Sequence, residues 1–168
     1  MSRLGGGRAW VFGDDIDTDV LAPGIYMKGP IEEMARHCLE SVEPAFAGTV
    51  AEGDVVVGGR NFGLGSSREQ APQCLRLLGV AAVLAPSFGG IFYRNALNLG
   101  LPALVCAEAQ RIGQGNTVTV DPLAGEVRDE TAGLTLACEP LPAHLVAMLA
   151  DGGLVPHLER RFRGGQQQ

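Results

Sequence analysis

The sequence predicts an α/β fold with a mostly parallel core sheet and an antiparallel hairpin near its C-terminal end. Three observations lead to this prediction. The run Asp54–Val57 is continuously apolar after its first residue, as in a strand that is buried on both faces. Strand, helix and strand patterns then alternate over residues 81–106. Finally, two alternating segments, 117–121 and 126–129, flank the turn sequence Pro122–Gly125, which is typical of a hairpin.

Strands are expected where short apolar or alternating runs lie between turn residues. In chain order they are Arg8–Phe12, Asp54–Val57, Ala81–Ala85, Ala103–Cys106, Thr117–Asp121, Glu126–Asp129 and Leu134–Leu136. The strands joined by helices over 54–106 are expected to be parallel, with right-handed crossovers. The hairpin makes the last part of the sheet antiparallel.

Helices are expected where apolar residues recur at helical spacing, or where proline and acidic residues suit a first turn. They are Ile31 to about Glu40, a short piece ending at Phe46–Gly48, a helix starting at Ser66 or Ser67, Ile91–Leu99, Pro142–Leu149 and Leu154–Phe162. His37 in the first of these is expected to be a surface or hydrogen-bonded residue. Leu21–Lys28 is expected to be extended or irregular, with an exposed tip.

The composition narrows the class of protein and argues against several functions. With 168 residues, 46% hydrophobic and 19% charged, the chain has the proportions of one globular domain over 1–168, with flexible ends at 1–7 and 164–168. A net charge of −6 without a basic block argues against nucleic-acid or anionic-membrane partners. No apolar run is long enough for a signal peptide or a membrane span, so a cytoplasmic location is expected.

The cysteines and an acidic loop are the candidate metal ligands. Cys38, Cys74, Cys106 and Cys138 lie far apart without a C-x-x-C pair, so buried free thiols are expected rather than a zinc or iron–sulfur site. The loop Gly13–Asp19 has four carboxylates but lacks the central Gly and final Glu of a calcium loop. We therefore expect no metal on this chain, and turn formation or helix capping by the aspartates.

The segment Gly58–Gln70 contains the residues that are the best candidates for binding or catalysis. Its four glycines allow sharp turns and a close approach of the backbone to a ligand. Ser66 and Ser67 lie where a helix is expected to begin, and each is followed three residues later by Glu or Gln, the spacing of a capping box. Pro72 cannot donate to the carbonyl of Arg68, so that carbonyl is expected to stay free.

Two interpretations of this segment remain open from the residues alone. The serines cap a helix and do nothing more, or helix N–H groups and the Arg68 guanidinium together form a site for an acidic ligand. The segment matches neither a P-loop nor a dinucleotide-binding fingerprint. Arg60 and Arg94 are further positive charges expected near it.

These motifs resemble the small subunits of the aconitase-type dehydratases, the group of 3-isopropylmalate dehydratase and homoaconitase. The resemblance covers most of the chain and rests on Gly13–Asp19, Asn61–Glu69, Ala85–Phe88, Phe92–Ala96 and Asn98–Pro102. It implies the β/β/α layers of the aconitase swivelling domain. It also implies a hydro-lyase, active only as a heterodimer with a large subunit that carries a [4Fe–4S] cluster, while this chain binds none.

The resemblance also implies roles for individual residues. Ser66 matches the serine that removes or returns the proton, and Asp19 matches an acid that supports a histidine of the partner. The residues matched to substrate binding are Gly65, Ser67, Arg68, Asn61, Tyr26, Met27 and Lys28. Physically, a serine needs positive surroundings to act as a base, because an alkoxide must be stabilised.

The substrate implied is a branched malate-type hydroxy-dicarboxylic acid. Aconitase carries an arginine shortly after the loop equivalent to Tyr26–Lys28, whereas this chain has Gly29–Ile31 there. Loss of a carboxylate partner favours an apolar branch, as in 3-isopropylmalate in leucine biosynthesis or a methylated malate, over citrate. Lys28 keeps homoaconitate as an alternative. A non-enzymatic carboxylate-binding module and a purely structural subunit are the remaining alternatives.

Overall fold

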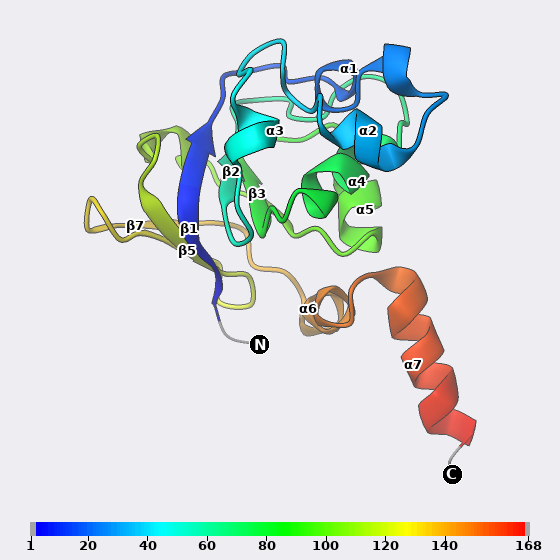
Figure 1. The fold of residues 1–168 in the computed structure, drawn as a ribbon. Helices are drawn as coiled ribbons and strands as arrows, with labels where there is room; N and C mark the ends of the chain where they lie inside the picture. Colours follow the sequence, from blue (N-terminus) through cyan, green and yellow to red (C-terminus); the bar gives the residue numbers. More distant parts are fainter. Residues whose placement is uncertain (1–2, 167–168) are drawn as a thin grey trace.

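A single seven-stranded sheet organises the computed structural model, which describes residues 3–166 (Figure 1). The strands lie in the order β4-β3-β2-β1-β5-β6-β7. They are β1 Leu4–Val11, β2 Val55–Val57, β3 Ala82–Ala85, β4 Ala103–Val105, β5 Thr117–Asp121, β6 Glu126–Asp129 and β7 Leu134–Ala137. The pairs among β1 to β4 are parallel, and β1 pairs with β5 in the antiparallel sense, as do β5 with β6 and β6 with β7. The predicted α/β fold is confirmed.

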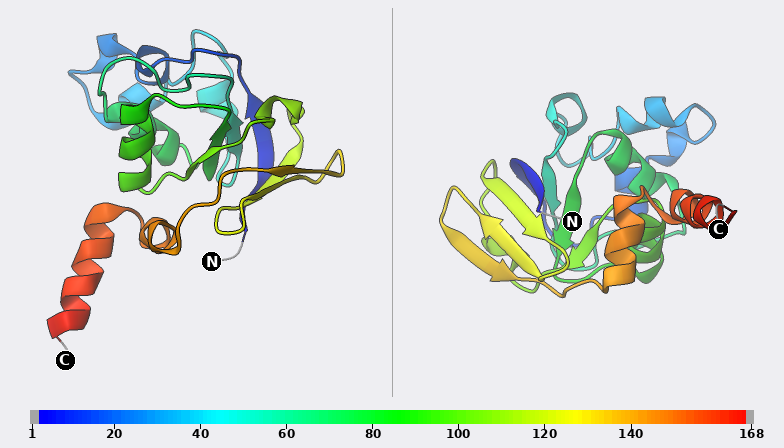
Figure 2. Two further views of the ribbon diagram at one scale, coloured as in Figure 1. Left: turned by 180° about the vertical axis from the view of Figure 1, so that it is seen from behind. Right: turned by 90° about the horizontal axis from the view of Figure 1, so that it is seen from below.

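The sheet has an apolar core on each face of its parallel part. Trp10, Val56 and Val83 belong to the core on the face that the helices α1 to α5 cover. Val55 and Val57 point to the opposite face, where residues of the antiparallel strands and of α6 form the second core. The antiparallel strands therefore cover one face of the parallel strands, which gives the β/β/α layers visible in Figure 2. Burial on both faces explains why the β2 sequence is continuously apolar.

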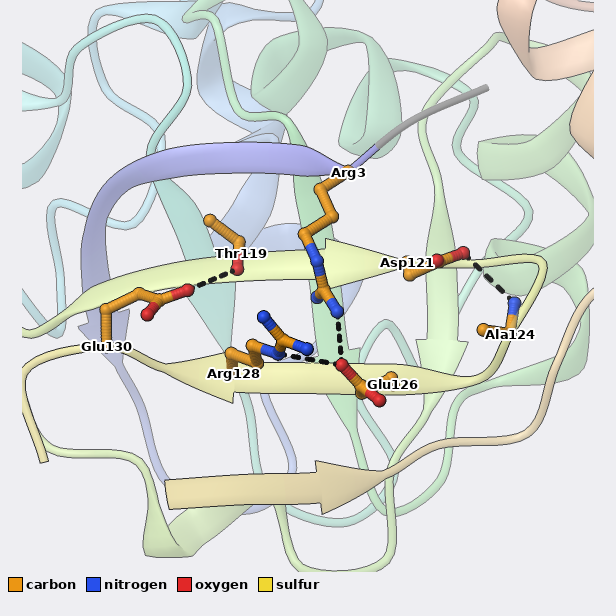
Figure 3. Close-up of polar contacts among 7 residues, drawn as sticks. All are labelled: Arg3, Thr119, Asp121, Ala124, Glu126, Arg128 and Glu130. Atoms are coloured by element: carbon orange, nitrogen blue, oxygen red, sulfur yellow. Dashed lines mark hydrogen bonds and ion pairs between the residues drawn. The ribbon is translucent and has the colours of Figure 1, made fainter. Parts of the chain in front are cut away.

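The outer face of the antiparallel strands is polar. In Figure 3, Arg3 and Arg128 both donate to the Glu126 carboxylate, and Thr119 of β5 donates to Glu130, which directly follows β6. The hydrogen bond from Arg3, with that from Arg128, holds the pKa of Glu126 below its ordinary value. These contacts tie the start of the chain to β6, on the face that is not packed against the parallel strands.

Seven helices connect and flank the strands in the described part of the chain. They are α1 Thr18–Leu21, α2 Ile31–Ala35, α3 Phe46–Thr49, α4 Gln70–Leu77, α5 Gly90–Asn98, α6 Ala143–Ala150 and α7 Leu154–Gln166, with 3-10 turns η1 Gly24–Tyr26 and η2 Ala109–Arg111. In Figures 1 and 2, α7 extends away from the rest of the molecule. No helix among residues 3–166 is long and apolar enough to cross a membrane. The expected cytoplasmic location stays a prediction.

The predicted helix from Ile31 to about Glu40 is wrong in its second half. The helix α2 ends at Ala35, and the chain continues in turns. Leu39 has φ +61°, a left-handed conformation that a continuing α-helix does not accommodate. His37 lies in these turns, with its Nδ1 2.6 Å from Glu40 Oε2. This hydrogen bond raises the pKa of His37, and it confirms the interpretation of a hydrogen-bonded histidine.

Regular secondary structure extends into both ends that were expected to be flexible, and their flexibility stays a prediction. Residues 4–7 of the segment expected to be flexible lie in β1, where Leu4 aligns with Val120 of β5. At the other end, α7 continues through Gln166. Residues 1–2 and 167–168 lie outside the described part of the chain.

All four cysteines are buried and free, as predicted. Burial raises the pKa of Cys74 to about 12 and, with nearby negative charges, that of Cys138 to about 11. Burial also raises the pKa values of Cys38 and Cys106. Within residues 3–166, no three histidine, cysteine, aspartate or glutamate side chains come together as metal ligands.

Candidate functional site

The glycine-rich loop leaves the carboxyl end of β2 and is anchored by one aromatic side chain. Phe62 is fully buried, and its ring lies edge-on to Phe88 and Phe92 at centroid distances of 6.1 Å and 5.4 Å. Gly63 follows with φ +79°, and a Cβ there would lie 2.2 Å from Cγ of Phe92. Only glycine lets the backbone pass this close to the ring in this conformation. The exposed end of the loop is thus built on a rigid base.

The acidic loop crosses the glycine loop through backbone hydrogen bonds. Gly63 N donates to Ile16 O at 2.6 Å, and Thr18 N donates to Leu64 O at 2.9 Å. Asp17 caps α1, because its Oδ1 accepts from Val20 N at 2.8 Å. The capping interpretation is confirmed for this aspartate. Two segments nearly fifty residues apart in the chain are therefore fixed in register at the site.

The predicted helix start at Ser66 or Ser67 is wrong. Both serines are exposed, and α4 begins at Gln70 without a side-chain cap. Pro72 then lies in the first turn, where the N–H groups have no partner within the helix, so the missing N–H of proline costs nothing. A helix starting at Ser67 would place Pro72 in its interior. The carbonyl of Arg68 also accepts from Ala71 N at 3.2 Å, so it is not free as expected.

Ser66 has a hydroxyl neighbour that no sequence motif indicates. The Oγ1 atom of Thr18 lies 3.3 Å from Oγ of Ser66. Thr18 is 3% exposed. Gly65, which precedes Ser66, has φ +112°, and a Cβ added to it would lie 3.0 Å from Thr18 Oγ1. The contact spans 48 positions in the sequence, so a local pattern could not have revealed it.

Arg68 and Asp19 form the charged part of the site. Nη1 of Arg68 donates to Asp19 Oδ1 at 2.9 Å and to the carbonyl of Ala22 at 2.7 Å. The same Asp19 oxygen accepts from Gly24 N at 3.0 Å. The hydrogen bond from Arg68, and then that from Gly24, hold the pKa of Asp19 below its ordinary value. Asp19 thus joins Arg68 to the loop that carries Tyr26–Lys28.

That loop is partly ordered by stacking. It contains the 3-10 turn η1 rather than a fully extended chain, and the Tyr26 ring stacks on His37 at 3.8 Å with an interplanar angle of 6°. Tyr26 is therefore half-buried, and the prediction of an exposed tip holds only for Met27 and Lys28. Asp19 connects this loop to the glycine-rich segment, because it accepts hydrogen bonds from both Gly24 N and Arg68 Nη1.

Asn61, Arg60 and Arg94 make no contact with the two serines in the described part of the chain. The Asn61 side chain donates to Asp15 Oδ1 at 3.1 Å. Arg60 is paired with Asp14 at 3.4 Å. Arg94 is exposed on α5 and makes no ion pair within residues 3–166. The geometry brings together Gly65, Ser66, Ser67, Arg68 and Asp19, with Thr18 added.

The layered sheet and the crossing of these two loops define a class of protein, the aconitase-type swivelling domain. Residues 40–109 match the family model described as the aconitase C-terminal domain. A crystal structure titled 3-isopropylmalate dehydratase from Methanocaldococcus jannaschii superposes with a TM-score of 0.89 at 41% identity, covering 96% of each chain.

Curated relatives narrow the class to one family. The 3-isopropylmalate dehydratase small subunit of Syntrophus aciditrophicus is 45% identical over 160 residues, 94% of this chain and 98% of the relative. The methanogen homoaconitase small subunit of Methanothermobacter thermautotrophicus is 46% identical over 153 residues, 90% and 88% of the two chains. The chain belongs to the family of 3-isopropylmalate dehydratase and homoaconitase small subunits, which are hydro-lyase components.

Proposed function

We propose that this chain is the small subunit of a hydro-lyase that isomerises 3-isopropylmalate to 2-isopropylmalate by removing and re-adding water. The observation that supports the proposal is the exposed pair Ser66-Ser67 followed by the half-buried Arg68, which the acidic loop holds on a fold shared with dehydratase small subunits. A second chain that covers this exposed segment would enclose the substrate and exclude water from it. A large dehydratase subunit is the proposed partner.

The roles proposed for this chain are proton transfer and carboxylate binding. Ser66 removes the substrate proton as an alkoxide and returns it from the hydroxyl, while Ser67 and Arg68 contact a substrate carboxylate. The helix α4 begins at Gln70 and not at the serines, so Arg68, which follows Ser67 in the chain, is the positive group proposed to act beside them. Asp19 and the Ala22 carbonyl hold Nη1 of Arg68, which fixes the direction of the guanidinium.

The [4Fe–4S] cluster implied by the family does not fit this chain. Its cysteines are buried free thiols, and among residues 3–166 no group of three or more histidine, cysteine, aspartate or glutamate side chains forms that could hold a metal ion. We therefore assign the cluster, which supplies a Lewis acid for the substrate hydroxyl, to the large subunit. The roles of Ser66, Ser67 and Arg68 are independent of cluster geometry.

Homoaconitate is a second candidate substrate. Lys28 is exposed beside the exposed Met27 on the loop next to the site, and an ammonium group there suits an additional carboxylate. One of the similar chains is named as a homoaconitase small subunit. A substrate panel on the reconstituted pair, with 3-isopropylmalate, methylated malates and homocitrate, separates these candidates by their kcat/KM values.

The test of the catalytic role is Ser66→Ala in the complex reconstituted with its large subunit, iron and sulfide. We expect turnover to fall by at least about 100-fold. The absorbance of the unsaturated diacid measures this turnover. Because Ser66 is exposed and does not cap a helix, the free energy of unfolding should fall only by the loss of its hydrogen bond with Thr18, about 1 kcal/mol.

Ser41→Ala is the matched control, since Ser41 is also exposed. Wild-type turnover in Ser66→Ala would contradict the proposed role. Tight carboxylate binding by this chain alone, with no activity in any reconstituted pair, would instead favour a non-enzymatic binding module.

A further inference from the structure

We propose that Thr18 is a positioning residue for Ser66, and that its hydroxyl donates a hydrogen bond to the serine when that serine is an alkoxide. The proposal rests on the proposed function of Ser66. Thr18 is an uncharged residue of the acidic loop Gly13–Asp19, and neither the capping nor the charge of that loop explains its hydroxyl group.

The contact itself is specific. Thr18 Oγ1 and Ser66 Oγ lie 3.3 Å apart, and either atom can be the donor. Within residues 3–166, Thr18 is the only protein group that forms a hydrogen bond with the Ser66 hydroxyl. Ser66 is exposed, whereas Thr18 is 3% exposed. The serine is thus open to a substrate on one side and held by a buried hydroxyl on the other.

Thr18 is fixed by its own backbone. Its N–H donates to Leu64 O at 2.9 Å, and its carbonyl accepts from Ala22 N at 2.8 Å. It is the first residue of α1, which Asp17 caps. A β-branched side chain in such a position has few accessible rotamers. The hydroxyl therefore offers Ser66 a preorganised partner, which costs little reorganisation during the reaction.

The loop is shaped to bring the two hydroxyls together. Gly65 has φ +112°, and a Cβ at this residue would come within 3.0 Å of Thr18 Oγ1. Few residues other than glycine adopt this backbone conformation. A larger residue would both strain the turn and push against the threonine hydroxyl. The glycine that precedes Ser66 thus serves the Thr18–Ser66 contact directly.

Hydrogen-bond chemistry gives the pair a function. An alkoxide accepts hydrogen bonds only, whereas a hydroxyl both donates and accepts. When Ser66 is an alkoxide, Thr18 donates its O–H to it. When Ser66 has taken the substrate proton, the serine hydroxyl is free to donate to Thr18. Thr18 keeps its own proton throughout, so the substrate proton ends on Ser66 Oγ. A donor of this kind favours the alkoxide and lowers the pH at which it forms.

The test compares Thr18→Val with Thr18→Ser in the reconstituted two-subunit enzyme. Valine keeps the volume and removes the hydroxyl, whereas serine restores the hydroxyl. We expect Thr18→Val to lower kcat roughly 10-fold to 100-fold with little change in KM, and to move the limb on which kcat rises with pH to higher pH. Thr18→Ser should recover most of the activity and the wild-type pH profile. Thr135→Val, on the exposed side of β7, is the matched control.

Several outcomes decide between the proposals. If Ser66→Ala abolishes turnover but Thr18→Val keeps the wild-type kcat and pH profile, the role of Thr18 is refuted while that of Ser66 stands. If Ser66→Ala is fully active, the proposed function fails first. Adding Thr18→Val to Ser66→Ala should cause no further loss, because the pair acts as one unit. If Thr18→Val does not assemble, Thr18→Ala and Thr18→Ser, which differ by one oxygen, provide the comparison.

Discussion

Asp54 is a buried carboxylate whose removal should destabilise the junction of β1 and β2 without touching the candidate site. It is 2% exposed and lies just before β2. Its Oδ1 accepts from Arg8 N at 2.9 Å, and its Oδ2 accepts from Trp10 Nε1 at 3.0 Å and Ala51 N at 2.9 Å. Burial alone would raise the pKa of Asp54, but these donors outweigh it and hold the pKa below its ordinary value.

The size of the effect follows from these three bonds. In Asp54→Asn, the amide oxygen can replace only one of the two carboxylate oxygens. The amide NH2 group takes the place of the other oxygen, where it faces an N–H donor and cannot accept from it. One hydrogen bond to a charged group is lost, at about 1.5–3 kcal/mol, and the remaining ones weaken. We expect the free energy of unfolding to fall by about 3 kcal/mol, which lowers Tm by roughly 6–12 °C in a chain of this size.

The pH dependence has a definite sign. Because the folded-state pKa of Asp54 lies below its value in the unfolded chain, about 3.9, its contribution is fully present well above that pH. It is lost as pH falls through the folded-state pKa. The stability difference between wild type and Asp54→Asn should therefore be constant from about pH 6 to pH 8 and shrink below about pH 4.

Urea unfolding followed by circular dichroism at neutral and acidic pH measures this difference. Glu52→Gln is the matched control, because Glu52 is an exposed carboxylate two positions away. Equal urea midpoints for wild type and Asp54→Asn at pH 7, or a difference that does not shrink in acid, would refute the reasoning. The reconstituted activity of Asp54→Asn should stay at the wild-type level at a temperature where both proteins are folded.

Two further predictions concern the glycine loop and the buried thiols. Gly63→Ala should lower the free energy of unfolding by about 2–6 kcal/mol for two reasons. Alanine rarely adopts a φ of +79°, and its Cβ would lie 2.2 Å from the Phe92 ring. A Tm equal to that of Gly13→Ala, where no atom lies within 4 Å of the added Cβ, would contradict this. A thiol reagent at pH 8 should modify the native chain slowly and all four cysteines after unfolding, since they are buried and burial raises the pKa of Cys74 to about 12. Rapid labelling of the native chain would count against this burial.

Six of the seven strands were predictable because each depends on local signals. Apolar runs between turn residues located every strand of the sheet to within a few residues. The first strand is the exception, since it begins at Leu4 and includes three glycines that locally indicate flexibility. Its early part is held by pairing with β5, more than a hundred residues later. Long-range pairing of this kind leaves no trace in a local pattern.

The residues of the candidate site stay a prediction, and their local geometry could not be read from the sequence. The glycine loop and Arg68 were recognisable, but either serine fitted a capping box, and the position of the helix start was decided by Pro72. Thr18 gives no signal of its own in the sequence, because a threonine between two aspartates looks like part of a turn. Its partner lies 48 positions away, and only the crossing of two loops brings them together.

The pairing of Asp19 with Arg68 joins three parts of the site into one unit. Only Nη1 of Arg68 is used by Asp19 and Ala22, and Nη2 and Nε have no protein acceptor within the described residues. The guanidinium can therefore be held by Asp19 and still offer donors to a substrate carboxylate. Since Gly24 N bonds the same Asp19 oxygen, movement of the loop with Met27 and Lys28 would shift Asp19 and with it Arg68. In the proposed reaction, the loop that meets the variable branch of the substrate is thus mechanically coupled to the group that binds its carboxylate.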